Sequence, residues 1–120
     1  MTQDRLTLGR QGEDAAALFL QRLGMKIVER NLSTKVGEID LIVRDRKTLA
    51  FVEVKTRRGT AFGSPAEAVG PRKQRQIIRA AKWYLNDSPH QGLQPRFDVI
   101  AIIVHGDDFQ IEHIPGAFEV

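Results

Sequence analysis

The chain has 120 residues, of which 42% are hydrophobic and 28% are charged, and its formal net charge is +3. This length and composition predict a single globular domain spanning residues 1–120. The absence of cysteine excludes a disulfide scaffold, a thiolate zinc site and a cysteine nucleophile. No segment resembles a signal peptide or approaches the ~20 apolar residues of a membrane helix. We therefore expect a soluble, cytoplasmic protein with no membrane partner.

The positive charge is concentrated in one part of the chain. Residues 55–82 contain eight basic residues and one acidic residue, a net charge of +7, so the rest of the chain carries −4. A surface that contacts phosphates needs such a concentration of bases. A solvated helix face rich in arginine and lysine is the alternative explanation.

The first half of the chain predicts one helix and three strands. Apolar residues at helical spacing predict a helix from Leu8 to Leu23, and Gly24 is a suitable stop. A short strand, Lys26 to Arg30, follows. Two further strands, about Glu38–Arg44 and Leu49–Thr56, are separated by four polar residues and form a hairpin. The predicted inward stripe of the helix consists of Ala15, Ala16, Phe19, Leu20 and Leu23.

The second half predicts one long helix and two strands. Ser64 to Glu67 has the pattern of a helix start, but Gly70 and Pro71 interrupt it. A longer helix runs from Pro71 to about Leu85. Residues Arg96–Val104 are nearly all apolar after Asp98, as in a central strand covered on both faces, and Phe109–Ile114 forms a last strand. The fold class is therefore α/β, a mixed β-sheet flanked by helices in the order α-β-β-β-α-β-β.

The hairpin brings two acids together. If its loop is symmetric, opposed residues have numbers that add up to 93, which places Asp40 opposite Glu53 and Glu38 opposite Lys55. Side chains alternate along each strand. This register therefore gives one wholly apolar face, and a slip of one residue would mix the two faces. That apolar face consists of Ile39, Leu41, Val43, Ala50, Val52 and Val54.

Two opposed carboxylates repel unless a cation or a proton lies between them. Mg²⁺ or Mn²⁺ would resolve the conflict at Asp40 and Glu53, since hard divalent ions prefer carboxylate oxygens and keep several waters. Lys55 lies two residues beyond Glu53 on the same face, where it could orient a water or stabilise charge on a phosphate. These are the parts that phosphodiester hydrolysis needs. The alternative is a surface ion cluster in which Lys55 pairs with Glu38 or Glu53.

The hairpin motifs Gly37-Glu38-Ile39-Asp40-Leu41-Ile42 and Phe51-Val52-Glu53-Val54-Lys55-Thr56-Arg57 resemble the PD-(D/E)XK nuclease pattern. The chain is most similar to the small bacterial YraN-type family of that superfamily, and the resemblance includes Gly9-x-x-Gly12-Glu13. It implies a restriction-endonuclease-like core similar to archaeal Holliday-junction resolvases, metal ligands at the positions of Asp40 and Glu53, and a catalytic lysine at Lys55. The proline that often precedes the first acid is replaced here by Ile39.

Two further residues are candidates for the catalytic site. Glu13 lies in an early helical turn, where the helix dipole favours an acid. The resemblance implies instead that it reaches the metal or its waters, because related resolvases place a glutamate on the first helix. Gln74 falls on the inward stripe of the second helix, where a polar side chain needs a partner. It either bonds nearby backbone or points at the site, as a helix glutamine does in some related nucleases.

The bases nearest these motifs are the candidates for nucleic-acid contacts. Trp83 and Tyr84 are interpreted as core residues, with stacking on bases as the alternative. Asp98 is interpreted as a turn or cap residue. The three histidines lack metal-ligand spacing and are assigned no role. The candidate contacts to nucleic acid are Arg57, Arg58, Arg72, Lys73, Arg75 and Arg79, with Arg30 as a weaker one.

Three functions stay open at this point. The first is a Mg²⁺- or Mn²⁺-dependent endonuclease that acts on DNA, including branched or structured DNA; such substrates usually call for two sites and hence a homodimer. The second is a module that binds nucleic acid, DNA more than RNA, without cleaving it. The third is a protein-interaction scaffold whose basic surface is incidental.

Overall fold

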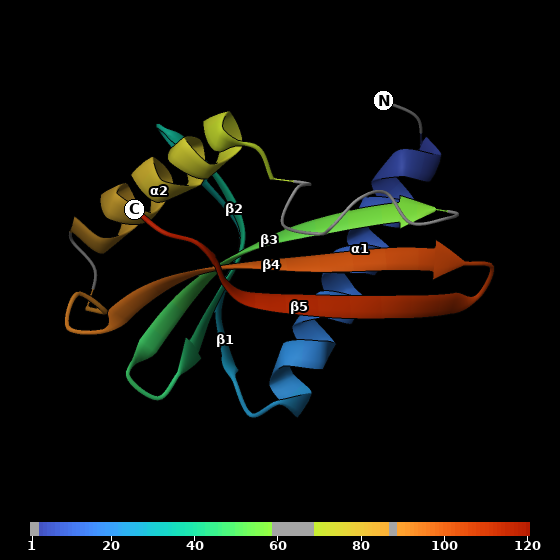
Figure 1. Ribbon diagram of the computed structural model, residues 1–120, viewed down its shortest axis with the longest axis horizontal. Coiled ribbons are helices and arrows are strands. Elements are labelled where there is room, and N and C mark those ends of the chain that lie inside the picture. Colours follow the sequence, from blue (N-terminus) through green and yellow to red (C-terminus); the bar gives the residue numbers. More distant parts are fainter. Residues whose placement is uncertain (1–2, 59–68, 87–88) are drawn as a thin grey trace.

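The computed structural model describes residues 3–58, 69–86 and 89–120, and the predicted helix start at Ser64–Glu67 lies outside these ranges. The elements follow the predicted order α-β-β-β-α-β-β, so the fold class is confirmed (Figure 1). Their bounds are α1 Gln3–Arg22, β1 Lys26–Thr34, β2 Gly37–Asp45, β3 Thr48–Arg58, α2 Pro71–Asn86, β4 Gln94–His105 and β5 Asp108–Phe118.

The five strands form one mixed sheet in the order β1-β2-β3-β4-β5. Neighbouring strands are antiparallel except β3 and β4, which are parallel. A parallel pair needs a crossover, and α2 lies in the segment that connects the two strands. No helix in the described ranges is long and apolar enough to cross a membrane.

The two helices cover opposite faces of the sheet (Figure 1). Helix α1 buries Ala16 and Leu20 against one set of strand side chains, including Leu41 and Val52. Helix α2 buries Ile77, Ala80 and Ala81 against the alternate set. That alternate set on the central strands includes Ile42, Leu49, Phe51, Phe97 and Val99. Successive apolar residues on β2, β3 and β4 therefore pack alternately against α1 and against α2, as expected of strands that are buried on both faces.

The predicted hairpin register is confirmed from Leu41–Val52 to Asp45–Thr48. Beyond Leu41 the prediction is wrong, because the backbone ladder ends there and the expected Asp40–Glu53 and Glu38–Lys55 backbone pairs are not formed. The physical reason is that the Asp40 carboxylate, in place of a backbone carbonyl, accepts the hydrogen bond of the Val54 N–H at 2.8 Å.

The loss of the ladder also changes where one apolar side chain goes. Ile39 packs in the α2 cluster with Ile42, whereas strict alternation placed it with Leu41 on the α1 face. Figure 1 shows the beginning of β2 near α2, whereas β3 continues alongside β4. The two strands of the hairpin therefore separate at Asp40.

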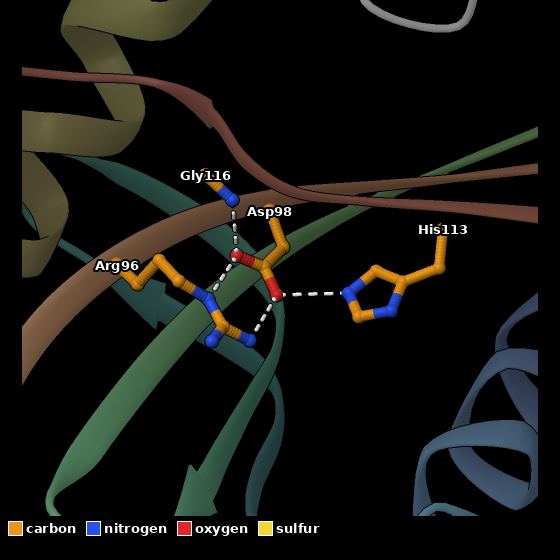
Figure 2. A network of polar contacts seen from close by, with 4 residues as sticks. All are labelled: Arg96, Asp98, His113 and Gly116. Carbon is orange, nitrogen blue, oxygen red and sulfur yellow. Dashed lines mark hydrogen bonds and ion pairs between the residues drawn. The ribbon is translucent and has the colours of Figure 1, made fainter.

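Asp98 is fully buried at the irregularity in the β4–β5 pairing, which contradicts its interpretation as a turn residue. Its Oδ1 accepts hydrogen bonds from Arg96 Nε and the Gly116 N–H, and its Oδ2 from Arg96 Nη2 and His113 Nε2, at 2.8–3.0 Å (Figure 2). Burial opposes ionisation, but the hydrogen bonds from His113 and Arg96 outweigh it and lower the pKa of Asp98. The carboxylate thus ties β5 to β4 and is engaged on every side by structural partners.

Two other predictions about the core are wrong. Leu23, expected on the inward stripe of α1, follows the last residue of the helix and is exposed. Trp83, expected in the core, is 48% exposed on α2. Leu23 is exposed because the helix ends before it, whereas Trp83 lies on the outward side of α2 beside Tyr84, which packs inward.

Helix α1 approaches β3 closely at Gly12. A Cβ at this position would lie 1.9 Å from Thr56 Oγ1 and 3.0 Å from Thr56 Cβ. We expect Gly12→Ala to lower the free energy of unfolding by about 1–3 kcal/mol, because the helix must move away from the strand. Urea unfolding measures this change.

Gly9→Ala is the matched control: a Cβ there meets nothing within 4 Å, so alanine should raise the stability by about 0.5–1 kcal/mol. Equal effects of the two substitutions would contradict the close contact.

Candidate active site

The candidate site forms where β2 and β3 separate. Asp40 comes from β2 and Glu53 from β3, and their carboxyl groups are joined by a hydrogen bond. Glu53 is 7% exposed, and its side chain lies between the sheet and α2. The sequence predicted that these two acids meet, and the structure brings them together through their side chains rather than through a backbone pair.

The environment of Glu53 strongly disfavours its charged form. Burial, the hydrogen bond to Asp40 and the charge of Asp40 raise the pKa of Glu53 to about 8. Lys73 and Lys55 act in the opposite direction but do not compensate. In its protonated form Glu53 donates the hydrogen bond to Asp40, so at neutral pH a proton occupies the place between the two carboxylates.

Two lysines contribute positive charge at Glu53. Lys55 lies two residues along β3, and its charge interacts favourably with Glu53. Lys73 of α2 places its Nζ 3.6 Å from Glu53 Oε2, and its side chain is 37% exposed. The sequence analysis assigned Lys73 to the nucleic-acid surface, whereas the structure also places it against the carboxyl pair.

Glu13 approaches the pair from α1, on the other side of the sheet. Burial and the charge of Asp40 raise the pKa of Glu13, while a hydrogen bond with Asn31 acts against this rise. Its Oε1 is buried and has no hydrogen-bond partner among the described residues. A buried carboxylate oxygen without a partner is costly. Glu13 therefore has a carboxylate oxygen available for a ligand, and its charge interacts with that of Asp40.

The donor set fits a hard divalent cation that keeps most of its waters. In the described ranges, no group of three histidine, cysteine or acidic side chains could hold a metal ion by itself. A magnesium ion is often held by only one or two carboxylates, with water and substrate phosphate completing its coordination. The Asp40–Glu53 pair supplies two such carboxylates, and the unpartnered Glu13 oxygen is a further acceptor for a cation-bound water.

Gln74 does not join this group. Its Nε2 donates a hydrogen bond to the Val69 carbonyl oxygen at 2.9 Å, which is the local backbone partner that the sequence analysis left open. The backbone N–H of Gln74 also bonds the Gly70 carbonyl. The side chain therefore holds the segment that leads into α2, one residue away from the lysine that does reach Glu53.

The predicted phosphate contacts fall into three groups. Arg72, Arg75 and Arg79 are exposed along α2, and Arg57 and Arg58 are exposed at the end of β3. Arg30 differs from them, because its Nη2 bonds Asp14 Oδ1 at 2.6 Å and its charge also acts on Glu13. Arg30 is thus engaged in holding α1 to β1 beside the site.

Sequence reasoning missed Asn31. This residue has a φ of +52° inside β1, and its side chain bonds Glu13. Asparagine tolerates the left-handed conformation better than most residues. The sequence analysis ended this strand at Arg30, whereas β1 continues through Asn31 to Thr34; strands are depleted in asparagine, so the pattern gave no sign of this extension.

A model of the family described as "Uncharacterised protein family UPF0102" matches residues 12–102. Several related proteins are similar over almost their whole length. A UPF0102 protein of Syntrophotalea carbinolica is 59% identical over 100% of this chain and 98% of its own. One from Desulfosudis oleivorans is 51% identical over 99% and 95%, and one from Rhodococcus jostii is 52% identical over 94% and 97%.

The family match includes every residue of the candidate site, from Glu13 through Asp40, Glu53 and Lys55 to Lys73. The identity to these relatives extends well beyond the hairpin motifs and covers both helices and the sheet. The chain therefore belongs to the UPF0102 family.

Proposed function

We propose that this protein is a Mg²⁺- or Mn²⁺-dependent endonuclease of the PD-(D/E)XK superfamily that hydrolyses phosphodiester bonds in DNA. The observation that carries the proposal is the carboxyl pair of the buried Glu53 and the partly buried Asp40, with Lys55 two residues further along β3. Without a cation, a proton reduces the repulsion between the two acids. A divalent cation bound by both carboxylates can take the place of that proton.

Each residue has a defined task in this reaction. Asp40 and Glu53 would hold the cation, whose positive charge polarises the phosphate and acidifies a water. Lys55 stabilises the negative charge that grows on the phosphate oxygens while the bond from water to phosphorus forms and the ester P–O bond breaks. Glu13 orients water through its unpartnered Oε1. The products are a phosphate monoester and a hydroxyl group.

The basic residues of α2 support DNA as the substrate. The helix contains five basic residues and no acidic residue. Its Lys73 reaches the carboxyl pair, so a phosphate bound near Lys73 lies next to the proposed metal position. A branched substrate would require a second site, which makes a homodimer a further prediction of this proposal.

A second candidate function has one specific observation in its favour. Lys73 already brings a positive charge to Glu53 without any metal. In a protein that binds DNA without cleaving it, Lys73 would be the permanent counterion of the carboxylates. The other basic side chains of α2 would bind DNA phosphates, as they would in a nuclease.

A metal titration and a substrate panel separate these two functions. We expect calorimetry to detect Mn²⁺ binding to the wild type, and fluorescent junction, flap, single-stranded and duplex DNA to reveal cleavage in Mn²⁺. Glu53→Gln should remove both, since glutamine keeps the shape but supplies no charged ligand. Glu112→Gln, an exposed position on β5, is the matched control and should change neither. DNA binding without metal binding in the wild type would leave only the second function.

A further inference from the structure

Helix α2 presents an outward face that is exposed in the described part of the chain. We call the exposed residues Arg72, Arg75, Arg79, Lys82 and Trp83 the basic face of α2. They lie three, four, three and one positions apart, and at about 100° per residue they share one side of the helix. The opposite side carries the buried Ile77, Ala80 and Ala81.

Trp83 is an unusual member of this face. An indole ring is among the most costly side chains to leave in water, yet Trp83 is 48% exposed. Its neighbours on the outward side of α2 are arginine and lysine side chains, and the helix contains no acidic residue that would neutralise their charge. A protein partner with an apolar surface would have to desolvate these charges, whereas a polyanion with apolar rings complements both features.

Nucleic acid has this combination, but only where its bases are unpaired and unstacked. In a duplex the faces of the bases are covered by their neighbours, so a protein contacts phosphates and groove edges. An unpaired nucleobase exposes a face on which an aromatic side chain can stack. Arginine and lysine side chains on either side of the aromatic ring then bind the phosphate backbone.

We propose that the basic face of α2 binds a single-stranded segment of DNA, with Trp83 stacking on an unpaired base. The proposal rests on the proposed function only for the class of partner, nucleic acid, and not on cleavage. It makes the substrate of the candidate site a DNA with an unpaired region next to the phosphate that reacts.

The position of Trp83 relative to the site sets a length. Ten residues separate Trp83 from Lys73, which contacts Glu53. At about 1.5 Å per residue the two positions lie about 15 Å apart along the helix axis. The base that stacks on Trp83 therefore lies at about this distance from the phosphate bound near the carboxyl pair.

Trp83 is the only tryptophan in the chain, so its intrinsic fluorescence reports on the proposed contact directly. We titrate the wild type with oligothymidine and with a blunt duplex, in EDTA and about 50 mM salt, where no cleavage occurs. Oligothymidine is expected to quench the fluorescence and the duplex to leave it nearly unchanged. Equal quenching by both DNAs would overturn the proposal.

Variants then test the energy of the contact. Trp83→Ala should weaken oligothymidine binding, followed by anisotropy of a labelled strand, by about tenfold and leave duplex binding unchanged. Trp83→Phe should retain most of the affinity. Phe109→Ala, which removes another exposed aromatic residue at the start of β5, is the control and should have no effect. Circular dichroism establishes that each variant is folded.

The outcomes separate this inference from the proposed function. Binding of single strands that depends on Trp83, together with no cleavage in Mn²⁺, would support the inference and refute the nuclease. Cleavage with unchanged affinity in Trp83→Ala would refute the inference alone. Self-association of the wild type that Trp83→Ala abolishes would assign this face to a second copy of the chain and overturn the proposal.

Discussion

Lys55→Ala is expected to lower the rate of DNA cleavage by about a hundredfold to a thousandfold, which is typical of removing one preorganised group that stabilises transition-state charge. Lys55 lies two residues beyond Glu53 on β3 and interacts with it electrostatically, but it contributes no ligand atom to a cation. Its loss should therefore leave Mn²⁺ affinity nearly unchanged. Single-turnover cleavage at saturating DNA measures the chemical step separately from binding.

Lys47→Ala is the matched control for this experiment. Lys47 is exposed in the turn between β2 and β3, at the other end of the same hairpin. The substitution removes the same charge from the protein, so it accounts for any general loss of attraction to DNA. If both variants slowed cleavage equally, the role of Lys55 would be long-range electrostatics only, and its assignment as the catalytic lysine would be wrong.

The local pattern of the sequence predicted much of the fold. Alternation on β2 and β3 gave the correct pairing from Leu41–Val52 to Asp45–Thr48, since a shift would have placed polar groups in the core. The apolar run after Asp98 correctly indicated a central strand, which pairs with β3 on one side and β5 on the other. These features depend on residues near each other in the chain, or on the spacing of apolar residues along a single helix or strand.

The remaining features depend on contacts between distant segments. The separation of β2 from β3 follows from the Asp40 carboxylate binding the Val54 N–H, and no alternation rule contains that bond. Gln74 and Lys73 are adjacent in sequence, so only the packing of α2 decides which of them reaches Glu53. The interpretation of Asp98 as a turn residue was wrong because two of its partners, His113 and Gly116, come from the next strand.

The two acids of the candidate site were therefore predictable from the sequence, but their electrostatics were not. The pair of acids could be found from the motif, whereas the proton that they share depends on burial beneath α2 and on the direct hydrogen bond between the carboxyl groups. These two causes determine how the protein should respond to pH.

The stability of the protein is expected to fall as pH rises toward 8. Glu53 has an ordinary pKa of 4.5 and a folded-state pKa of about 8. Between these values the folded state holds a proton that the unfolded state has released, so the free energy of unfolding falls as the pH rises. The contribution is complete below the lower value and is lost as pH rises through the upper one. Urea unfolding at several pH values measures the slope.

Glu53→Gln isolates this contribution, because glutamine resembles the protonated acid and does not titrate. The difference in stability between the variant and the wild type should grow in favour of the variant as pH rises from about 5 to about 8, whereas Glu112→Gln should run parallel to the wild type. Parallel curves for Glu53→Gln would mean that the carboxyl pair does not share a proton.

A divalent cation should reverse the trend in the wild type. A cation that binds Asp40 and Glu53 must displace the shared proton, so its apparent affinity should rise about tenfold per pH unit up to about 8 and then level off. Mn²⁺ should consequently raise the unfolding midpoint more at high pH than at low pH, since the stabilisation by a ligand increases with the logarithm of one plus the ratio of its concentration to its dissociation constant. In Glu53→Gln the same addition should have little effect at any pH. An equal effect of Mn²⁺ on both proteins would place the metal elsewhere and remove the link between the buried acids and catalysis.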